Sequence, residues 1–235
     1  MNKTLLVGTV SNVSAKGNDV TRFTVKTTRG KSTSYVSCVA FRKEDAEVIA
    51  DGARVSLTGH IQTGSYTNKE GQRVYTTDVA VNSVKATDST EDLNLVVLMG
   101  RLTRDPMVSY STGETPVAVA RFTTAVDRRT AKKAEGEQAA DFISTKALGR
   151  LGEFTEKYLH KGVKILLTGY IQTGSYTNKE NVKVYTTDVL CDDIEFAESK
   201  SASNNAAGNP AVATVGTGDF MDIPDSLEDE GLPFN

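Results

Sequence analysis

Tyr66 and Tyr176 occupy the same position in two nearly identical segments, and each has basic residues close by. The basic neighbours are Lys69 and Arg73 in the first segment, and Lys179 and Lys183 in the second. An aromatic ring among cations can stack on a nucleic-acid base while the cations meet phosphates. Aromatic side chains are also widely used for packing. Taken alone, these residues favour packing, and base stacking is the alternative.

The two segments are residues 59–79 and 169–189, which are identical at 17 of 21 positions and lie 110 residues apart. Such self-similarity indicates an internal duplication. Residues suited to a pleated strand flank the polar sequence Asn-Lys-Glu in both copies, which is typical of a β-hairpin with a turn at its tip. The sequence therefore predicts two equivalent hairpins, each with a tyrosine near the tip.

Three strands and a helix are predicted ahead of each hairpin. In the first copy the strands are 4–10, 20–28 and 33–41 and the helix is 43–50; in the second, the first strand begins at Leu93, the third strand is 142–148 and the helix is 149–159. Five strands with one helix between the third and fourth is the order of an OB-fold, a five-stranded Greek-key barrel. We therefore predict a mainly all-β chain with two tandem OB-folds, each carrying one short helix.

The third strand of each copy has two candidate faces. Alternation places Tyr35 and Phe41 opposite the smaller residues Val36, Cys38 and Ala40, and the pattern alone allows either set to face the core. In the second copy Lys146 lies between Phe142 and Leu148, which indicates that this face meets solvent. The equivalence of the copies then turns Tyr35 and Phe41 outward too.

Composition divides the chain into five parts. The predicted division is an OB-fold at 1–86 with shortened loops, a linker at 87–92, a second OB-fold at 93–197, a flexible linker at 198–218 and an acidic tail at 219–235. The net charge is +4 over 1–90, −1 over 91–197 and −6 over 198–235. A basic first copy and an acidic tail suggest an anionic ligand at one end and a cationic partner at the other.

Signals for catalysis or metal binding are missing from the sequence. Cys38 and Cys191 occupy non-equivalent positions in strand-like runs, and His60 and His160 are isolated, so we expect buried thiols in a reducing compartment and neither a metal nor a cofactor. There is no P-loop, nucleophile elbow or paired-carboxylate signature, which argues against an enzyme. No apolar run is long enough to span a bilayer, and we predict a cytoplasmic protein.

Several motifs together resemble the bacterial and phage single-stranded DNA-binding protein (SSB) family, in the form with two OB-folds per chain. They are LMGRLTRDP at 98–106, VAVARFTTAVDR at 117–128, the hairpins ending in VYTTDV, and an acidic tip with Leu-Pro-Phe at 232–234. The resemblance implies OB-folds that wrap single-stranded DNA without catalysis, and a tail that recruits replication and repair proteins. Because the family usually works with four OB-folds, it also implies a homodimer.

The resemblance assigns roles to individual residues. It places base stacking at Tyr35, Phe41, Tyr66, Phe142, Leu148 and Tyr176, and partner binding at Asp225, Glu228, Asp229, Glu230, Leu232, Pro233 and Phe234. Leu148 replaces an aromatic of the family, the chain has no tryptophan, and Asn235 follows the phenylalanine that normally ends the tail.

The leading hypothesis is sequence-tolerant binding of single-stranded DNA in replication, recombination and repair, near the nucleoid. Position predicts phosphate contacts for Arg22, Lys26, Arg42, Lys43, Lys69, Arg73, Arg121, Arg128, Arg129, Lys132, Lys133, Lys146, Arg150 and Lys179. One alternative is a recruitment hub that acts mainly through its tail. Another is an RNA-binding or strand-annealing protein of the same fold.

Overall fold

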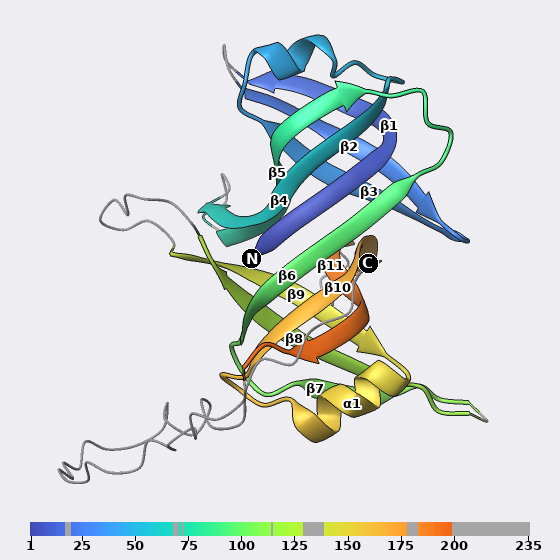
Figure 1. Ribbon diagram of the computed structural model, residues 1–235, viewed down its shortest axis with the longest axis vertical. Coiled ribbons are helices and arrows are strands. Elements are labelled where there is room, and N and C mark those ends of the chain that lie inside the picture. The colour runs from blue at the N-terminus through green and yellow to red at the C-terminus, as the bar shows by residue number, and fades with distance from the viewer. Residues whose placement is uncertain are drawn as a thin grey trace, which may run out of the picture.

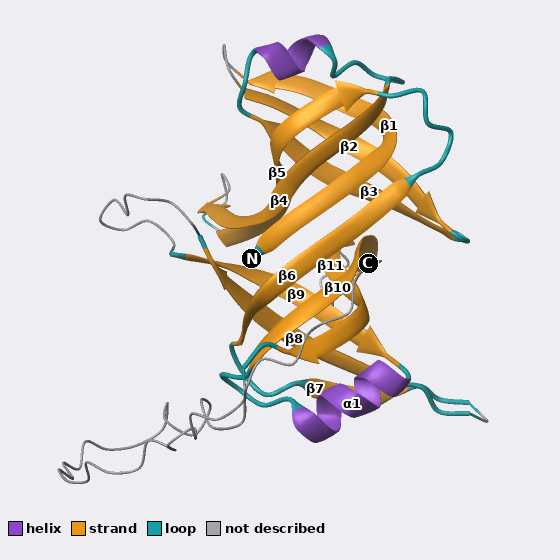
Figure 2. Cartoon of the chain, viewed as in Figure 1, coloured by secondary structure: helices purple, strands orange, loops and turns teal. Residues whose placement is uncertain are grey.

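The structure is a computed structural model that describes residues 1–16, 20–67, 71, 73–113, 115–128, 139–177 and 183–198. Its strands form two barrels that follow one another along the long axis of the molecule (Figure 1; Figure 2). The predicted linker at 198–218 lies outside the described residues apart from its first position, and the predicted tail lies wholly outside them.

Barrel 1 is built from five strands and one short 3-10 helix. They are β1 (Asn2–Lys16), β2 (Val20–Arg29), β3 (Ser32–Ala40), η1 (Glu44–Glu47), β4 (Arg54–Thr67) and β5 (Arg73–Ala86). The strands pair in the closed order β1-β2-β3-β5-β4 and back to β1, and only the β3–β5 pairing is parallel. This is the predicted OB-fold.

Barrel 2 repeats the plan with one added strand. Its elements are β6 (Leu93–Leu102), β7 (Met107–Tyr110), β8 (Ala118–Asp127), β9 (Ala140–Leu148), α1 (Arg150–Tyr158), β10 (Lys164–Thr177) and β11 (Lys183–Phe196). The barrel closes through a short β6–β8 pairing, and β7 adds to the outer edge of β8. The sequence predicted no strand where β7 lies, because a four-residue edge strand has little periodicity to recognise.

The helix predicted at 43–50 is wrong in type and length. The structure has a 3-10 helix over Glu44–Glu47, with i→i+3 hydrogen bonds such as Ala46 N to Lys43 O. A stretch this short forms few hydrogen bonds for each residue that it fixes, and its last turn carries no basic residue. The helix predicted at 149–159 is confirmed as α1, which has nine residues.

A close approach of backbone at a β-bulge explains one glycine in each repeated segment. Gly59 and Gly169 lie at the bulges of the β4–β5 and β10–β11 pairings. A Cβ on Gly59 would lie 2.4 Å from the carbonyl oxygen of Ala80, and one on Gly169 would lie 2.1 Å from that of Leu190. Any side chain at these positions would push the two strands of the hairpin apart.

The barrels join edge to edge through β1 and β6, their equivalent first strands. The two strands pair antiparallel from Asn2↔Leu98 to Val7↔Leu93, so one sheet runs through both barrels (Figure 1). The central pair is Thr4↔Val96. These two residues are equivalent in the duplicated copies, so the barrels are related by an approximate two-fold axis through this pair.

A side-chain amide in each barrel completes the pairing where the first strand and the hairpin strand separate. Asn94 donates from Nδ2 to the Ile171 carbonyl oxygen at 2.8 Å and accepts from the Ile171 N–H at 2.9 Å. Asn2 makes the equivalent two bonds to Ile61 at 2.7 and 2.9 Å. The duplicated copies have therefore kept the same device for closing the sheet.

We expect Asn94→Ala to lower the free energy of unfolding by about 2–6 kcal/mol. The substitution leaves the N–H and carbonyl of Ile171 without partners, and each unsatisfied buried group costs roughly 1–3 kcal/mol. Urea unfolding followed by circular dichroism measures the change. Asn82→Ala is the matched control, because the side chain of exposed Asn82 bonds the half-buried His60 ring and no backbone group of a neighbouring strand within the described residues, and it should shift stability little. Equal stability of both variants would contradict this role.

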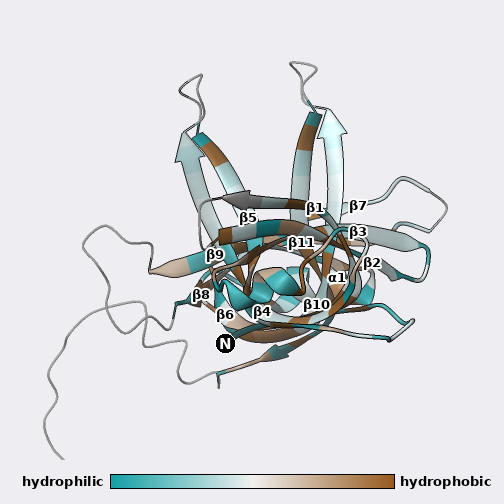
Figure 3. Cartoon of the chain, turned by 90° about the horizontal axis from the view of Figure 1, so that it is seen from above, coloured by the Kyte–Doolittle hydropathy of each residue, from teal (hydrophilic) through white to brown (hydrophobic). Residues whose placement is uncertain are grey.

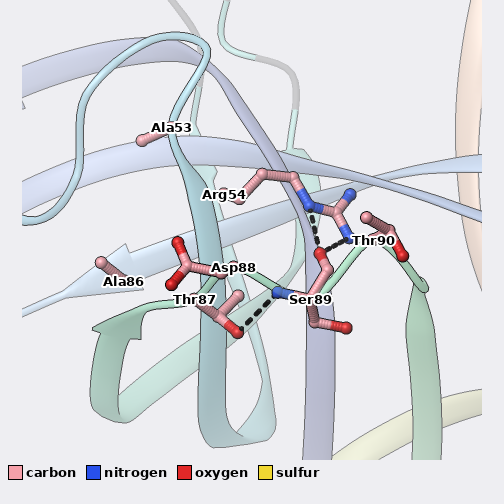
Figure 4. A pocket seen from close by; sticks show the side chains of 7 residues that line it. All are labelled: Ala53, Arg54, Ala86, Thr87, Asp88, Ser89 and Thr90. Atoms are coloured by element: carbon pink, nitrogen blue, oxygen red, sulfur yellow. Dashed lines mark hydrogen bonds between the residues drawn. The ribbon is translucent and has the colours of Figure 1, made fainter.

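One arginine fixes the connection between the barrels. The guanidinium of Arg54 donates to the Ser89 carbonyl oxygen at 2.8 and 3.0 Å, as Figure 4 shows, and to that of Glu91 at 3.0 Å. It also pairs with Asp92 at 2.6 Å, and the second oxygen of Asp92 accepts the Thr28 N–H at 2.8 Å. Residues 87–90 of the linker line a shallow pocket beside Arg54, and the bonds of Arg54 hold this part of the chain in place.

Both thiols are buried, as predicted. Burial is the largest cause that raises the pKa of Cys191, to about 12, and burial likewise raises that of Cys38. Because the thiolate is the reactive form, we expect no alkylation of the native protein by iodoacetamide at pH 8 and full alkylation in denaturant. Intact-mass spectrometry measures both. A thiol that reacts at the same rate in native and unfolded protein would contradict its burial.

Candidate nucleic-acid interface

The third strand of each barrel turns its aromatic face outward. Tyr35, Phe41 and Phe142 are 55%, 53% and 52% exposed, and Leu148 is 43% exposed. The alternating residues Val36, Cys38, Ala40, Ile143, Thr145 and Ala147 are buried. The predicted orientation is confirmed. The shared outer surface of β2 and β3, and of β8 and β9, is called the aromatic face of each barrel below.

Strand register brings cations onto these aromatic faces. Lys26 pairs with Tyr35 and Arg22 with Val39, so both basic side chains share the face of Tyr35. In barrel 2, Arg121 pairs with Lys146 on the strands that carry Phe142. Val39 is the exception to the outward pattern, since it is buried beside Ala80 of the neighbouring strand.

The two repeated hairpins extend beyond the barrels as arms. The first arm is residues 62–67 with 73–78, and the second is 172–177 with 183–188. Figure 3 shows both arms rising from the side of the molecule opposite the N-terminus. Tyr66 and Tyr176 are 56% and 57% exposed near the tips, so packing against the protein does not account for them.

Register places Tyr66 on the same side of the sheet as the aromatic face. Val39 pairs with Ala80 in β5, and alternation along β5 puts Asp78 and Val74 on that side as well. Val74 pairs with Tyr66. We call this the outer side of the arm. The second arm has the same register, with Tyr176 opposite Val184.

The sequence reasoning missed a second tyrosine on each arm. Tyr75 and Tyr185 are 76% exposed, more than any residue predicted to stack. Arg73 lies over the Tyr75 ring at 5.5 Å, and Lys183 over the Tyr185 ring at 5.2 Å. Both tyrosines belong to the repeated VYTTDV motif. Within each motif the tyrosine and the aspartate are three positions apart, so alternation along the strand could have placed them on opposite sides.

A carboxylate also lies on each outer side. Asp188 accepts a hydrogen bond from Ser144 Oγ at 2.5 Å and pairs with the Lys146 ammonium at 2.6 Å. In barrel 1, Asp78 accepts from Ser37 Oγ at 2.6 Å and pairs with Arg22 at 3.3 Å. Two cations predicted from the sequence, Arg22 and Lys146, are therefore partly neutralised by the protein itself.

Both barrels are similar to known proteins. Residues 1–87 and 93–197 match the model of the single-strand binding protein family. The chain belongs to this family. It is 39% identical over 147 residues to "Single-stranded DNA-binding protein 3" of Clostridium acetobutylicum, which covers 60% of this chain and 100% of that protein. It is 43% identical over 113 residues to "Single-stranded DNA-binding protein 1" of Staphylococcus aureus strain COL, covering 48% and 66% respectively.

Solved structures show the same fold. The wild-type single-stranded DNA binding protein from Thermus aquaticus matches with a TM-score of 0.61 at 19% identity, covering 91% of this chain and 97% of that one. A deletion mutant of the same protein gives a TM-score of 0.64 over 85% and 96%. At this identity the likeness concerns the fold, and it supports the arrangement of two OB-folds in one chain.

The remaining residues of this SSB-family chain that were predicted to contact phosphate fall into three groups. Arg42, Lys43, Arg73 and Arg150 are exposed, whereas Arg128 is half-buried. The Arg128 guanidinium pairs with the buried Asp141 carboxylate at 2.6 Å and is therefore engaged within the protein. The rest lie outside the described residues: Lys69, Arg129, Lys132, Lys133 and Lys179, together with the tail residues predicted to bind partners.

Other sites are not apparent in the described part of this SSB-family chain. Among those residues no group of three or more His, Cys, Asp or Glu side chains is placed to hold a metal ion. None of the described helices has the length and apolarity needed to cross a bilayer.

We expect Asp188→Asn to strengthen binding of oligo-dT about 5-fold at 0.1 M salt. Freeing Lys146 for one more phosphate contact steepens the slope of log K against log salt by about 0.7. Fluorescence-anisotropy titrations at several salt concentrations measure both quantities. Glu153→Gln on α1 makes the same charge change away from the arms and should do neither. Weaker binding by Asp188→Asn would mean that the carboxylate itself contacts the nucleic acid.

Proposed function

We propose that this chain binds single-stranded DNA with little sequence preference. The observation that carries the proposal is the duplicated set of exposed aromatics: Tyr35 and Phe142 on the faces, where cations lie on the same strands or the paired ones, and Tyr66 and Tyr176 on the arms. Every base has a face on which an aromatic ring can stack, so such a surface tolerates any sequence, and the cations meet the phosphates. The chain acts as a binding protein, without a catalytic step of its own.

Competition with matched oligonucleotides tests the proposal. A labelled oligo-dT bound by the full chain is challenged with unlabelled single-stranded DNA, duplex DNA and RNA of the same length. We expect single-stranded DNA of any sequence to compete best. Preferential displacement by RNA would favour the RNA-binding alternative, and equal displacement by duplex DNA would contradict recognition by stacking.

The proposal also assigns different functions to different segments of the chain. The two OB-folds, at 1–86 and 93–197, grip DNA, and residues 219–235 recruit replication, recombination and repair proteins through acidic groups and Phe234. The segments matched by the family model, 1–87 and 93–197, support these bounds. The proposed place of action is the nucleoid in the cytoplasm.

Deleting 219–235 separates this proposal from the recruitment-hub alternative. Removing seventeen residues with six acids and no base eliminates an anionic competitor, so affinity for DNA should stay or rise while recruitment is lost. A collapse of DNA binding on deletion would contradict the tether and favour a more direct role for the tail.

We also propose that two chains form a homodimer through the outer face of the joined sheet. Along β1 and β6, half-buried apolar residues alternate with buried core residues. The half-buried ones are Leu5, Val7, Leu95, Val97 and Met99. Leu5 pairs with Leu95, so the apolar surface crosses the junction of the barrels, with exposed Lys3 opposite Val97 on the same face. Such an apolar face is typical of a subunit interface, and one that straddles a two-fold axis suits a second copy.

A further inference from the structure

The arm of each barrel contacts the third strand of the other. The backbone N–H of Tyr35 donates to Thr173 Oγ1 at 2.8 Å, and that of Phe142 donates to Thr63 Oγ1 at 3.0 Å. The four residues are equivalent in pairs, so the contact is made twice. Each threonine therefore fixes the backbone of an outward-facing aromatic that belongs to the opposite barrel.

Sheet topology explains why those N–H groups need a partner from the other barrel. β3 pairs with β5 only at Cys38↔Val79 and Val39↔Ala80. At Tyr35 the two strands have separated, which leaves that edge of β3 without a neighbouring strand. The threonine hydroxyl supplies the missing acceptor, and an equivalent gap separates β9 from β11 at Phe142.

Equivalent arginines reinforce both crossings. Arg128 donates to the Thr63 carbonyl oxygen at 2.6 Å, and its partner Asp141 accepts the Thr63 N–H at 2.8 Å. Arg29 pairs with Asp192 at 2.7 Å and lies 4.3 Å from the centre of the Tyr170 ring. The base of each arm is thus held against the opposite barrel by several bonds.

The same side of each arm carries the tyrosine that the sequence reasoning missed. Thr63 pairs with Thr77 and Ser65 pairs with Tyr75, so alternation puts Tyr75 on the side of Thr63. Two residues along a strand span about 7 Å. Tyr75 therefore lies one step toward the tip from the crossing with Phe142. Register places Tyr185 equivalently beyond Thr173 and Tyr35. We call this the inner side of the arm.

Charge distinguishes the inner side from the outer side. On the outer side Asp78 and Asp188 neutralise basic residues. On the inner side Arg73 and Lys183 lie over the tyrosine rings, and within the described ranges neither forms an ion pair with a carboxylate. A highly exposed ring beside an unneutralised cation is the combination that stacks a base and meets its phosphate.

We propose that Tyr75 with Arg73, and Tyr185 with Lys183, are further nucleotide-binding positions on the inner sides of the arms. Each extends the aromatic face of the opposite barrel, Tyr75 next to Phe142 and Tyr185 next to Tyr35. Single-stranded DNA that leaves the aromatic face of one barrel then contacts the arm of the other barrel. This inference rests on the proposed function.

Tryptophan reporters test the new positions directly, because the chain has no tryptophan. In separate full-length variants, Tyr75→Trp and Tyr185→Trp are titrated with oligo-dT at low salt, with binding followed independently by anisotropy of labelled DNA. We expect saturable quenching of both reporters in step with binding. Tyr158→Trp is the control, since Tyr158 is also exposed and has Lys157 over its ring but lies on α1, and it should not be quenched.

The cross-barrel assignment has its own test. We expect Phe142→Ala to reduce quenching of the Tyr75→Trp reporter but not of the Tyr185→Trp reporter, and Tyr35→Ala to do the reverse. We also expect Tyr75→Ala to weaken binding about 5- to 100-fold, while Tyr75→Phe retains it. Circular dichroism confirms that each variant is folded.

The outcomes separate this inference from the proposed function. Unquenched reporters in variants that still bind oligo-dT would overturn the inference and leave the proposed function standing. Equal responses of both reporters to Phe142→Ala and to Tyr35→Ala would overturn the cross-barrel arrangement. No binding of oligo-dT by the unsubstituted chain would overturn the proposed function and the inference together.

Discussion

The double substitution Tyr66→Ala with Tyr176→Ala lowers the affinity of the full chain for oligo-dT by about 30- to 20,000-fold. Each ring removed costs roughly 1–3 kcal/mol of base stacking, and both rings are more than half exposed near the tips of the arms, where the loss leaves no cavity in the core. Fluorescence anisotropy of labelled oligo-dT at fixed salt measures the loss. The slope of log K against log salt should change little, because no cation is removed.

The matched control for this experiment is the pair Tyr110→Ala and Tyr158→Ala. Both tyrosines are about as exposed as the arm residues, but they lie on β7 and α1, at the end of barrel 2 (Figure 1). The control variant should bind as the unsubstituted protein does. If the control loses as much affinity as the arm variant, or if the arm variant loses none, the arms are not stacking platforms.

The substitution Leu95→Glu converts the proposed homodimer into a monomer. Leu95 lies opposite Leu5 at the middle of the apolar outer face, and an interface that repeats each contact by symmetry would bury two unpaired carboxylates. Light scattering on a size-exclusion column should show the mass fall from about twice 25.2 kDa to 25.2 kDa. The side chain points away from the core, so the barrels should stay folded.

Val117→Glu is the control for the dimer experiment, since Val117 is exposed on barrel 2 away from the joined sheet. It should leave the mass unchanged. A monomeric mass for the unsubstituted protein would contradict the homodimer. A dimer that persists in Leu95→Glu would place the interface on another surface.

Much of each barrel could be predicted from local patterns. Alternation in the third strands separated Tyr35 and Phe41 from buried Cys38, because a half-buried strand has a period of two residues. The two hairpins followed from strand-forming residues around a polar turn in both copies, and the helix predicted at 149–159 corresponds to α1. These features depend on residues that are close in sequence.

The features that sequence reasoning missed depend on residues that are far apart. Pairing of β1 with β6 leaves no trace in the pattern of either strand, and neither do the crossings of Thr63 and Thr173. The sequence predicts a phosphate contact for Arg128, but tertiary contacts bury the Asp141 carboxylate and engage the arginine. The error at 43–50 has a different cause, since helix propensity could not overcome the short span.

The most direct test of single-strand binding by stacking is intrinsic tyrosine fluorescence of the unsubstituted protein, titrated with a long oligo-dT at two salt concentrations. The chain has eight tyrosines and no tryptophan, so the signal reports on rings such as Tyr35, Tyr66 and Tyr176. We predict quenching that saturates, with an affinity that falls steeply as salt rises. Absence of both quenching and binding at low salt would contradict the account and leave the barrels as scaffolds for the tail.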